Sequence, residues 1–144
     1  MNLEHELVRW QSETGWTHAV TLTCHRPTTE EGIKKTAEHY LKRLDQDCFG
    51  KAHLRCRRGS RVGSFVSYGL GANGDHPHLH LSLVLPKDMK AETFEKKIKK
   101  CARRTKNLNR EMKIEQYRDE GWLRYIILKD DHRPLMELCR SSRP

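Results

Sequence analysis

The stretch "DHPHLHLSLVLP", residues Asp75 to Pro86, decides the fold because its side chains divide into two chemically different rows. Side chains alternate between the two faces of a strand. One face is therefore apolar, with Leu79, Leu81, Leu83 and Leu85. The other face carries His78 and His80, and also His76 if the strand extends that far. The stretch predicts a strand that packs against helices on one side and presents imidazoles on the other.

Further strands are predicted on both sides of this stretch. Residues 62–71, "VGSFVSYGLG", form a strand pattern, and Asn73-Gly74 between the two segments is typical of a hairpin turn. Residues 16–24, "WTHAVTLTC", alternate and are rich in β-branched side chains. Residues 110–117, "REMKIEQY", predict a fourth strand.

Helical spacing of apolar residues predicts four helices. Residues 2–13 form a short one with Leu3, Leu7, Val8 and Trp10 inward. Residues 28–50 begin with a threonine cap and end at a glycine, residues 88–108 have a strongly basic face, and the last helix starts near Glu120. The order (α)βαββαβα predicts a single α+β domain over residues 1–144, with a central antiparallel sheet flanked by helices.

The charge of the chain predicts a polyanionic partner. The formal net charge is +9 and the pI is about 9.5, so nucleic acid is the first expectation and an anionic membrane surface the second. No stretch is long and apolar enough to span a bilayer, and the acidic start "MNLEHELVRW" is unlike a secretory signal. Five scattered cysteines do not indicate a disulfide framework. We therefore expect a cytoplasmic protein, or one inside the host cell if it is viral.

The alternating histidines predict a metal site or a catalytic site. Two imidazoles at positions i and i+2 of a strand converge on one point, which suits zinc, manganese, nickel or copper. The alternative is that His78 and His80 are solvated on an open sheet face. The segment "CFGKAHLRC" offers Cys48, His53 and Cys56 as a second cluster, but it lacks a fourth zinc ligand.

Three segments in order resemble the HUH endonuclease superfamily, and specifically the rolling-circle replication initiators (Rep proteins) of plasmids, phages and viruses. "AVTLT" (residues 19–23) is similar to the first Rep motif, and "PHLH" (residues 77–80) to the histidine–hydrophobic–histidine motif. "GWLRYIILK" (residues 121–129) resembles the third motif, a helix with a tyrosine followed by a lysine. The resemblance implies an HUH/Rep-like domain with a ferredoxin/RRM-like core, here without a helicase domain.

The resemblance also implies a reaction. His78 and His80 would hold a divalent metal, Mn²⁺ or Mg²⁺, and Tyr125 would attack a phosphate of single-stranded DNA to leave a 5′-phosphotyrosine link. A free phenol has a pKa of about 10, so a nearby cation is needed to favour the phenolate. Lys129 would assist near the phosphate, on the same helical face as Tyr125. Origin DNA, single-stranded or in a hairpin, would be nicked and rejoined to begin rolling-circle replication.

Several assignments stay open. The tyrosine and lysine are separated by three residues, where two are commoner in the family, and the strand before the histidines carries no acidic ligand. His76, Asp75 or water could be the third ligand, and Tyr117 is a second candidate nucleophile. The histidines at positions 18, 25, 39, 53 and 132 have no partner visible in the sequence and are interpreted as incidental. Trp122 is interpreted as a core anchor for the last helix.

DNA contacts are predicted for two basic clusters and one further arginine. These residues are Arg55, Arg57, Arg58 and Arg61 in a loop, Lys99, Lys100, Arg103 and Arg104 on a helix, and Arg124. Three rival functions remain: a single-tyrosine transposase or relaxase, a non-catalytic nucleic-acid-binding module, and a zinc hydrolase using the three strand histidines. A host or separately encoded helicase is a further candidate partner, and monomer and dimer both remain open.

Overall fold

A computed structural model describes residues 3–25, 28–50, 61–70, 77–129 and 132–140. The elements follow the predicted order, with one short strand and one turn added at the end. They are α1 (Leu3–Ser12), β1 (His18–Cys24), α2 (Glu30–Phe49), β2 (Ser64–Gly69), β3 (His78–Leu83), α4 (Ala91–Arg104), β4 (Leu108–Gln116), α5 (Gly121–Leu128), β5 (His132–Pro134) and the 3-10 turn η1 (Met136–Leu138).

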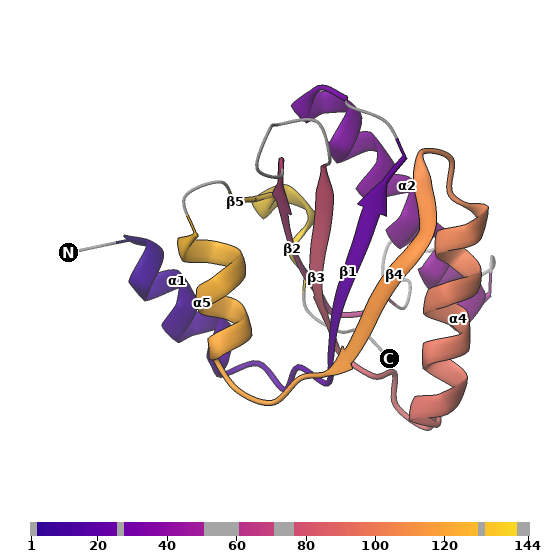
Figure 1. The fold of residues 1–144 in the computed structure, drawn as a ribbon. Coiled ribbons are helices and arrows are strands. Elements are labelled where there is room, and N and C mark those ends of the chain that lie inside the picture. Colours follow the sequence, from indigo (N-terminus) through magenta and orange to yellow (C-terminus); the bar gives the residue numbers. More distant parts are fainter. Residues whose placement is uncertain (1–2, 26–27, 51–60, 71–76, 130–131, 141–144) are drawn as a thin grey trace.

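The five strands form one antiparallel sheet in the order β4-β1-β3-β2-β5 (Figure 1). β2 and β3 pair with each other as the hairpin signal predicts, and β3 lies in the middle of the sheet. The turn residues between them lie outside the described residues. The predicted α+β class with a central antiparallel sheet is confirmed.

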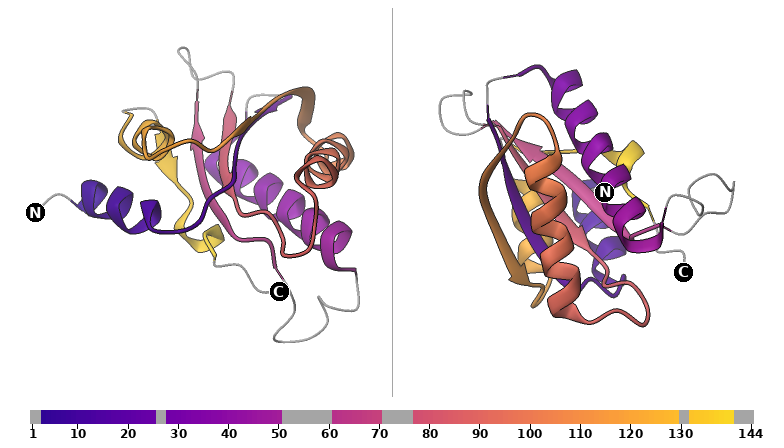
Figure 2. Two further views of the ribbon diagram at one scale, coloured as in Figure 1. Left: turned by 90° about the horizontal axis from the view of Figure 1, so that it is seen from below. Right: turned by 90° about the vertical axis from the view of Figure 1, so that its right-hand side faces the viewer.

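The helices cover opposite faces of the sheet. Figure 2 shows α2 and α4 on one side of the strands and α1 and α5 on the other. The leucines of β3 lie on the α2 and α4 side, in a cluster that also includes Tyr40 and Ile98. The Tyr40 hydroxyl donates to the Ile98 carbonyl at 3.2 Å, which satisfies a buried polar group between these two helices. The imidazole row of β3 consequently faces α5.

The second face has a smaller core between α5 and α1. Val8 and Trp16 pack there with Phe65 of β2 and with Leu123, Ile126 and Ile127 of α5. The prediction that α1 turns four apolar residues inward is wrong for two of them: Leu3 is 78% exposed and Trp10 is 60% exposed. The reason is that α1 packs mainly along α5, which covers only a narrow stripe around Val8.

Both ends of α2 have the local chemistry that the sequence indicates. The Thr29 hydroxyl accepts a hydrogen bond from the Gly32 amide at 3.0 Å, so it caps one of the first amides of the helix. Gly50 ends the helix with a φ of +83°, a value that side chains with a Cβ rarely adopt.

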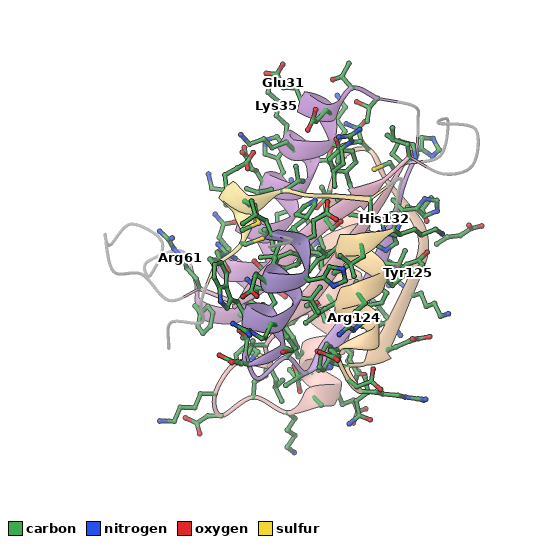
Figure 3. All side chains as sticks on the ribbon, turned by 90° about the vertical axis from the view of Figure 1, so that its left-hand side faces the viewer. Glu31, Lys35, Arg61, Arg124, Tyr125 and His132 are labelled. Atoms are coloured by element: carbon green, nitrogen blue, oxygen red, sulfur yellow. The ribbon has the colours of Figure 1, made fainter. Side chains whose placement is uncertain are left out.

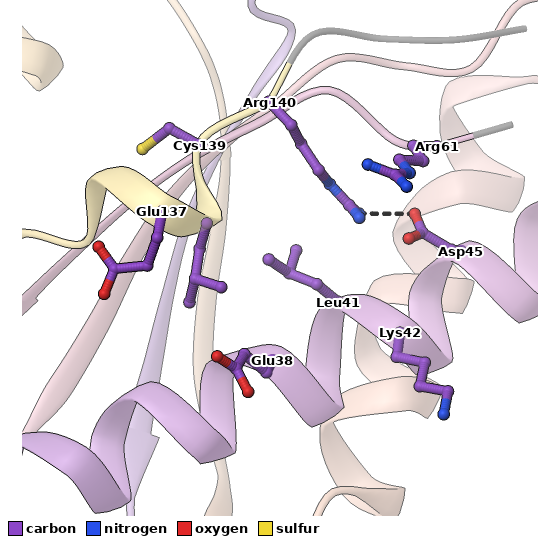
Figure 4. Close-up of a pocket in the computed structure, with 9 residues that line it drawn as sticks. Glu38, Leu41, Lys42, Asp45, Arg61, Glu137, Cys139 and Arg140 are labelled. Atoms are coloured by element: carbon purple, nitrogen blue, oxygen red, sulfur yellow. Dashed lines mark hydrogen bonds and ion pairs between the residues drawn. The ribbon is translucent and has the colours of Figure 1, made fainter. Parts of the chain in front are cut away.

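The C-terminal segment is fastened back onto α2. The Arg140 guanidinium pairs with the buried Asp45 carboxylate at 2.6 Å (Figure 4). The Val62 amide donates to the same carboxylate at 2.9 Å. Arg140 also exchanges backbone hydrogen bonds with Ser64 at the start of β2. These contacts hold the segment after β5 against the sheet.

The two outer strands differ in length and chemistry. β4 turns Glu111, Lys113 and Glu115 outward as exposed side chains, and Lys113 pairs with Glu115 at 3.0 Å. β5 is three residues long and ends in Pro134. No helix in the described part of the chain has the length and apolar character needed to cross a bilayer.

Candidate active site

The two motif histidines lie side by side on the α5 face of β3. His78 is half-buried and His80 is 5% exposed. Their rings are nearly parallel, at 8°, with centroids 6.2 Å apart. The predicted imidazole face is therefore present, and His80 is a buried part of it rather than a solvated side chain.

Threonines of β1 lie across from these histidines. Thr21 is the register partner of His80, and Thr23 is the partner of His78. The Thr21 hydroxyl lies 3.3 Å from His80 Nδ1. This contact engages Nδ1, so a metal held by His80 would bind through Nε2. The segment "AVTLT" thus supplies a side chain that orients the histidine motif.

Tyr125 reaches the histidines from α5. Its ring centroid lies 5.7 Å from that of His80, in an edge-to-face arrangement, although the two residues are far apart in the sequence. Ile126 and Ile127 pack into the core and fix which side of α5 faces the sheet. Tyr125 lies at the edge of that buried side and remains 43% exposed. A tyrosine in this position is open to a substrate and close to His80.

Trp122 lines the same place on the preceding turn of α5. Its ring lies 5.7 Å from His80 and 6.0 Å from Tyr125, and its Nε1–H donates to the Ser82 hydroxyl at 3.0 Å. It does anchor the helix to the sheet, as expected. Trp122 also lines the candidate site beside His80 and Tyr125, which the sequence does not predict.

His132, interpreted from the sequence as incidental, contacts both His80 and Tyr125 in the structure. Its centroid lies 4.6 Å from that of His80 and 4.8 Å from that of Tyr125, and the side chain is buried. Its Nδ1 lies 2.9 Å from the Tyr125 carbonyl oxygen. Figure 3 shows Arg124, Tyr125 and His132 along the side of the molecule formed by α5 and the strand after it. β5 brings His132 there by pairing it with Gly69 of β2.

Lys129 contacts Tyr125, but not through a shared helical face. The helix ends at Leu128, and Lys129 is in an extended conformation with ψ 137°. Its Nζ nevertheless lies 4.9 Å from the Tyr125 ring centroid, which is cation–π distance. The predicted proximity is confirmed, and the predicted helical geometry is wrong because the helix stops one residue earlier.

The donor chemistry fits a divalent metal bound through the His78–His80 pair. Imidazole nitrogens on one sheet face, with an exposed phenol beside them, leave the remaining coordination positions to water or phosphate. Among the described residues, no group of three or more histidine, cysteine or acidic side chains is arranged to hold a metal ion. His76 and Asp75, the suggested third ligands, lie outside the described residues.

Tyr117 lies in a different environment. It packs against the apolar cluster between α5 and the sheet. Its pKa is raised, first by burial and then by the negative charges of Asp119 and Glu120. A raised pKa disfavours the phenolate, so this environment suits a packing tyrosine better than a nucleophile.

The predicted DNA contacts fall on different sides of the molecule. Arg124 is exposed on α5 and pairs with Glu120 at 3.2 Å, so its charge is partly neutralised. The basic helix is α4, on the face of the sheet opposite α5 (Figure 2). Lys100 pairs with Asp47 at 3.2 Å, whereas within the described ranges no carboxylate pairs with Lys99, Arg103 or Arg104.

The arginine cluster of the loop is only partly described. Arg61 is exposed and lies near Asp45, at the cavity of about 430 Å³ between α2 and the C-terminal segment (Figure 4). Arg55, Arg57 and Arg58 lie outside the described residues, as do His53 and Cys56 of the second cysteine–histidine cluster.

Comparison of the chain with protein-family models, with curated proteins and with solved structures finds no match.

Proposed function

We propose that this protein nicks and rejoins single-stranded DNA through Tyr125, as a Rep-type HUH endonuclease that initiates rolling-circle replication. The observation that carries the proposal is the meeting of three separate segments: the histidine pair of β3, Thr21 of β1 and the exposed Tyr125 of α5. A tyrosine nucleophile needs access to a phosphate and a neighbouring positive charge; the exposure of Tyr125 gives the access, and Lys129 beside its ring gives the charge.

The proposed reaction is an exchange of phosphate esters. The Tyr125 oxygen attacks the phosphorus, the bond from phosphorus to the 3′ oxygen breaks, and the 3′ oxygen leaves as a hydroxyl after taking up a proton. The phenol loses its proton in the same exchange. Because one phosphodiester replaces another, the 3′ hydroxyl can attack the phosphotyrosine and restore the DNA strand.

His78 and His80 would hold the divalent metal, Mn²⁺ or Mg²⁺, which when bound supplies positive charge to the scissile phosphate. Lys129 lies 4.9 Å from the Tyr125 ring and adds a second positive charge beside the nucleophile. Trp122 is half-buried beside Tyr125, and we expect the exposed part of its ring to contact a base of the single strand.

The backbone topology is compatible with this proposal. From β1 to β4 the elements follow β-α-β-β-α-β, the order of a ferredoxin/RRM-like core. The strand order β4-β1-β3-β2 places the histidine strand centrally, and α5 with β5 extends the core beyond this unit. Function depends on the site and not on the fold, so the topology supports the proposal only indirectly.

The test is adduct formation on a denaturing gel. The protein is incubated with Mn²⁺ and a labelled pool of single-stranded and hairpin DNA. We expect a metal-dependent, SDS-resistant protein–DNA adduct that is lost in Tyr125→Phe and in His80→Ala and kept in the matched control Tyr117→Phe. Loss in Tyr117→Phe with retention in Tyr125→Phe would move the nucleophile and contradict the assignment.

The rival functions give different results in the same experiment. A non-catalytic binding module binds the DNA with no adduct and is indifferent to Tyr125→Phe. A zinc hydrolase cleaves DNA without a covalent product. A transposase or relaxase of the same superfamily forms the adduct and differs only in the DNA that it selects, so sequencing the joined strands distinguishes it from a replication initiator.

A further inference from the structure

His132 forms a link between the sheet and the helix that carries Tyr125. As a residue of β5 it pairs with Gly69, and its backbone amide donates to the Lys129 carbonyl at 2.9 Å. Its ring packs against both His80 and Tyr125. One side chain therefore contacts a proposed metal ligand and the proposed nucleophile together.

The hydrogen bond between His132 and Tyr125 determines which nitrogen of the imidazole carries the proton. The partner of His132 Nδ1 is the Tyr125 carbonyl oxygen, 2.9 Å away. A carbonyl oxygen can only accept, so Nδ1 must carry the proton and donate it. The bond acts on the backbone of Tyr125 itself and not on its phenol, so it can hold the residue in place and leave the hydroxyl available to a substrate.

The same contact closes the end of α5. The last carbonyls of a helix lack partners within the helix. Here the Tyr125 carbonyl accepts from His132, and the neighbouring Ile126 carbonyl accepts from the Ser67 hydroxyl of β2 at 2.6 Å. Two side chains from adjacent strands thus pin consecutive carbonyls of the last turn. The position of Tyr125 over the sheet depends on both.

We propose that His132 is a positioning residue, which sets Tyr125 against His80 by donating from Nδ1 to the Tyr125 carbonyl while its ring spaces the two side chains. This inference rests on the proposed function for its effect on catalysis. Its structural part, the fastening of α5, can be measured without DNA.

Three substitutions separate the roles of the side chain. His132→Asn keeps a donor close to the place of Nδ1, His132→Gln places one closer to that of Nε2, and His132→Phe keeps a ring without either donor. His39, an exposed histidine on α2, provides the control His39→Phe. The readouts are the single-turnover rate of adduct formation, the Kd for uncleaved DNA measured in a Tyr125→Phe background, the Mn²⁺ affinity and the hydrogen exchange of α5 amides.

We expect His132→Phe to slow adduct formation by about 10- to 100-fold, as misplacement of a reacting group does. The Kd for DNA should change little, hydrogen exchange at the end of α5 should rise, and His132→Asn should recover most of the rate and the protection. If only the packing of the ring mattered, His132→Phe would keep the rate and His132→Asn would lose it.

The inference would be overturned by a wild-type adduct rate in His132→Phe, or by recovery with glutamine and not with asparagine. A large loss of Mn²⁺ affinity in His132→Asn would also overturn it, because His132 would then act on the metal. If the wild-type protein forms no adduct at all, the proposed function fails. Loosening of α5 in His132→Phe, reversed in His132→Asn, would still support the fastening role.

Discussion

Burial raises the pKa of four cysteine thiols. Burial raises the pKa from its ordinary value of 9.0 to about 11 for Cys24, Cys101 and Cys139, and to about 12 for Cys48. The thiolate is the reactive form, so a raised pKa lowers the reactivity of a thiol at neutral pH. These cysteines are thus part of the packing and unsuited to nucleophilic roles.

Alkylation by iodoacetamide tests this at the residue scale. At pH 8 a thiol with a pKa near 11 is roughly one part in a thousand thiolate, and the fraction rises about tenfold for each pH unit up to that pKa. In a Cys56→Ser variant, we expect slow labelling at pH 8 that accelerates steadily towards pH 11, measured by mass spectrometry. Labelling of the folded protein at pH 8 as fast as in denaturant would contradict the raised values.

The residues of the site show what a sequence can predict. The alternation in "PHLH" predicts that His78 and His80 share one face of a strand, and the resemblance to Rep proteins adds Tyr125, which the structure brings next to His80. His132 was missed since nothing local marks it: its contacts arise only when a three-residue strand pairs with β2. A lone histidine becomes part of a site through pairing between distant segments, which periodicity does not report.

At the scale of elements, capping decides where α2 begins. The Thr29 hydroxyl accepts from the Gly32 amide, whereas the neighbouring Thr28 is exposed before the helix. We expect Thr29→Ala to lower the free energy of unfolding by about 1 kcal/mol, because an amide in the first turn loses its partner. Urea denaturation measures this, and Thr28→Ala is the matched control. Equal losses in the two variants would show that Thr29 is not the cap.

The elements also show why their bounds were harder to predict than their order. The predicted strand at residues 16–24 begins at His18, since Trp16 packs into the second core. The predicted last helix includes Lys129, whereas α5 ends at Leu128, where side chains from the strands bond to two of its final carbonyls. Order depends on local pattern, whereas bounds depend on tertiary partners.

For the whole molecule, the basic helix and the proposed reaction lie on opposite faces of the sheet. α4 carries Lys99 and Arg103 as exposed side chains that no described carboxylate neutralises, and its aromatic residue Phe94 is buried. A helix face with unpaired basic side chains, and with its aromatic ring buried, suits contact with phosphates rather than base stacking. DNA bound there would lie away from Tyr125.

Salt dependence tests this arrangement. We expect the double variant Lys99→Ala, Arg103→Ala to weaken DNA binding and to reduce the slope of log K against log salt by about 1 for each lost phosphate contact. The adduct rate at saturating DNA should stay unchanged. The control Lys34→Ala, Lys35→Ala removes the same charge from α2, where each lysine pairs with a glutamate. An unchanged slope with a slower adduct rate would contradict a separate phosphate-binding face.

The two edge strands of the sheet, β4 and β5, affect whether the protein aggregates at high concentration. A long apolar outer strand invites another copy to add its own strand and grow into aggregates. One edge strand, β4, carries alternating charged side chains that face outward, and two of them, Lys113 and Glu115, form an ion pair. The other edge strand, β5, is three residues long and ends in a proline, which lacks an amide hydrogen. The described sheet therefore offers a poor template for polymerisation, and we expect the protein to stay dispersed at high concentration.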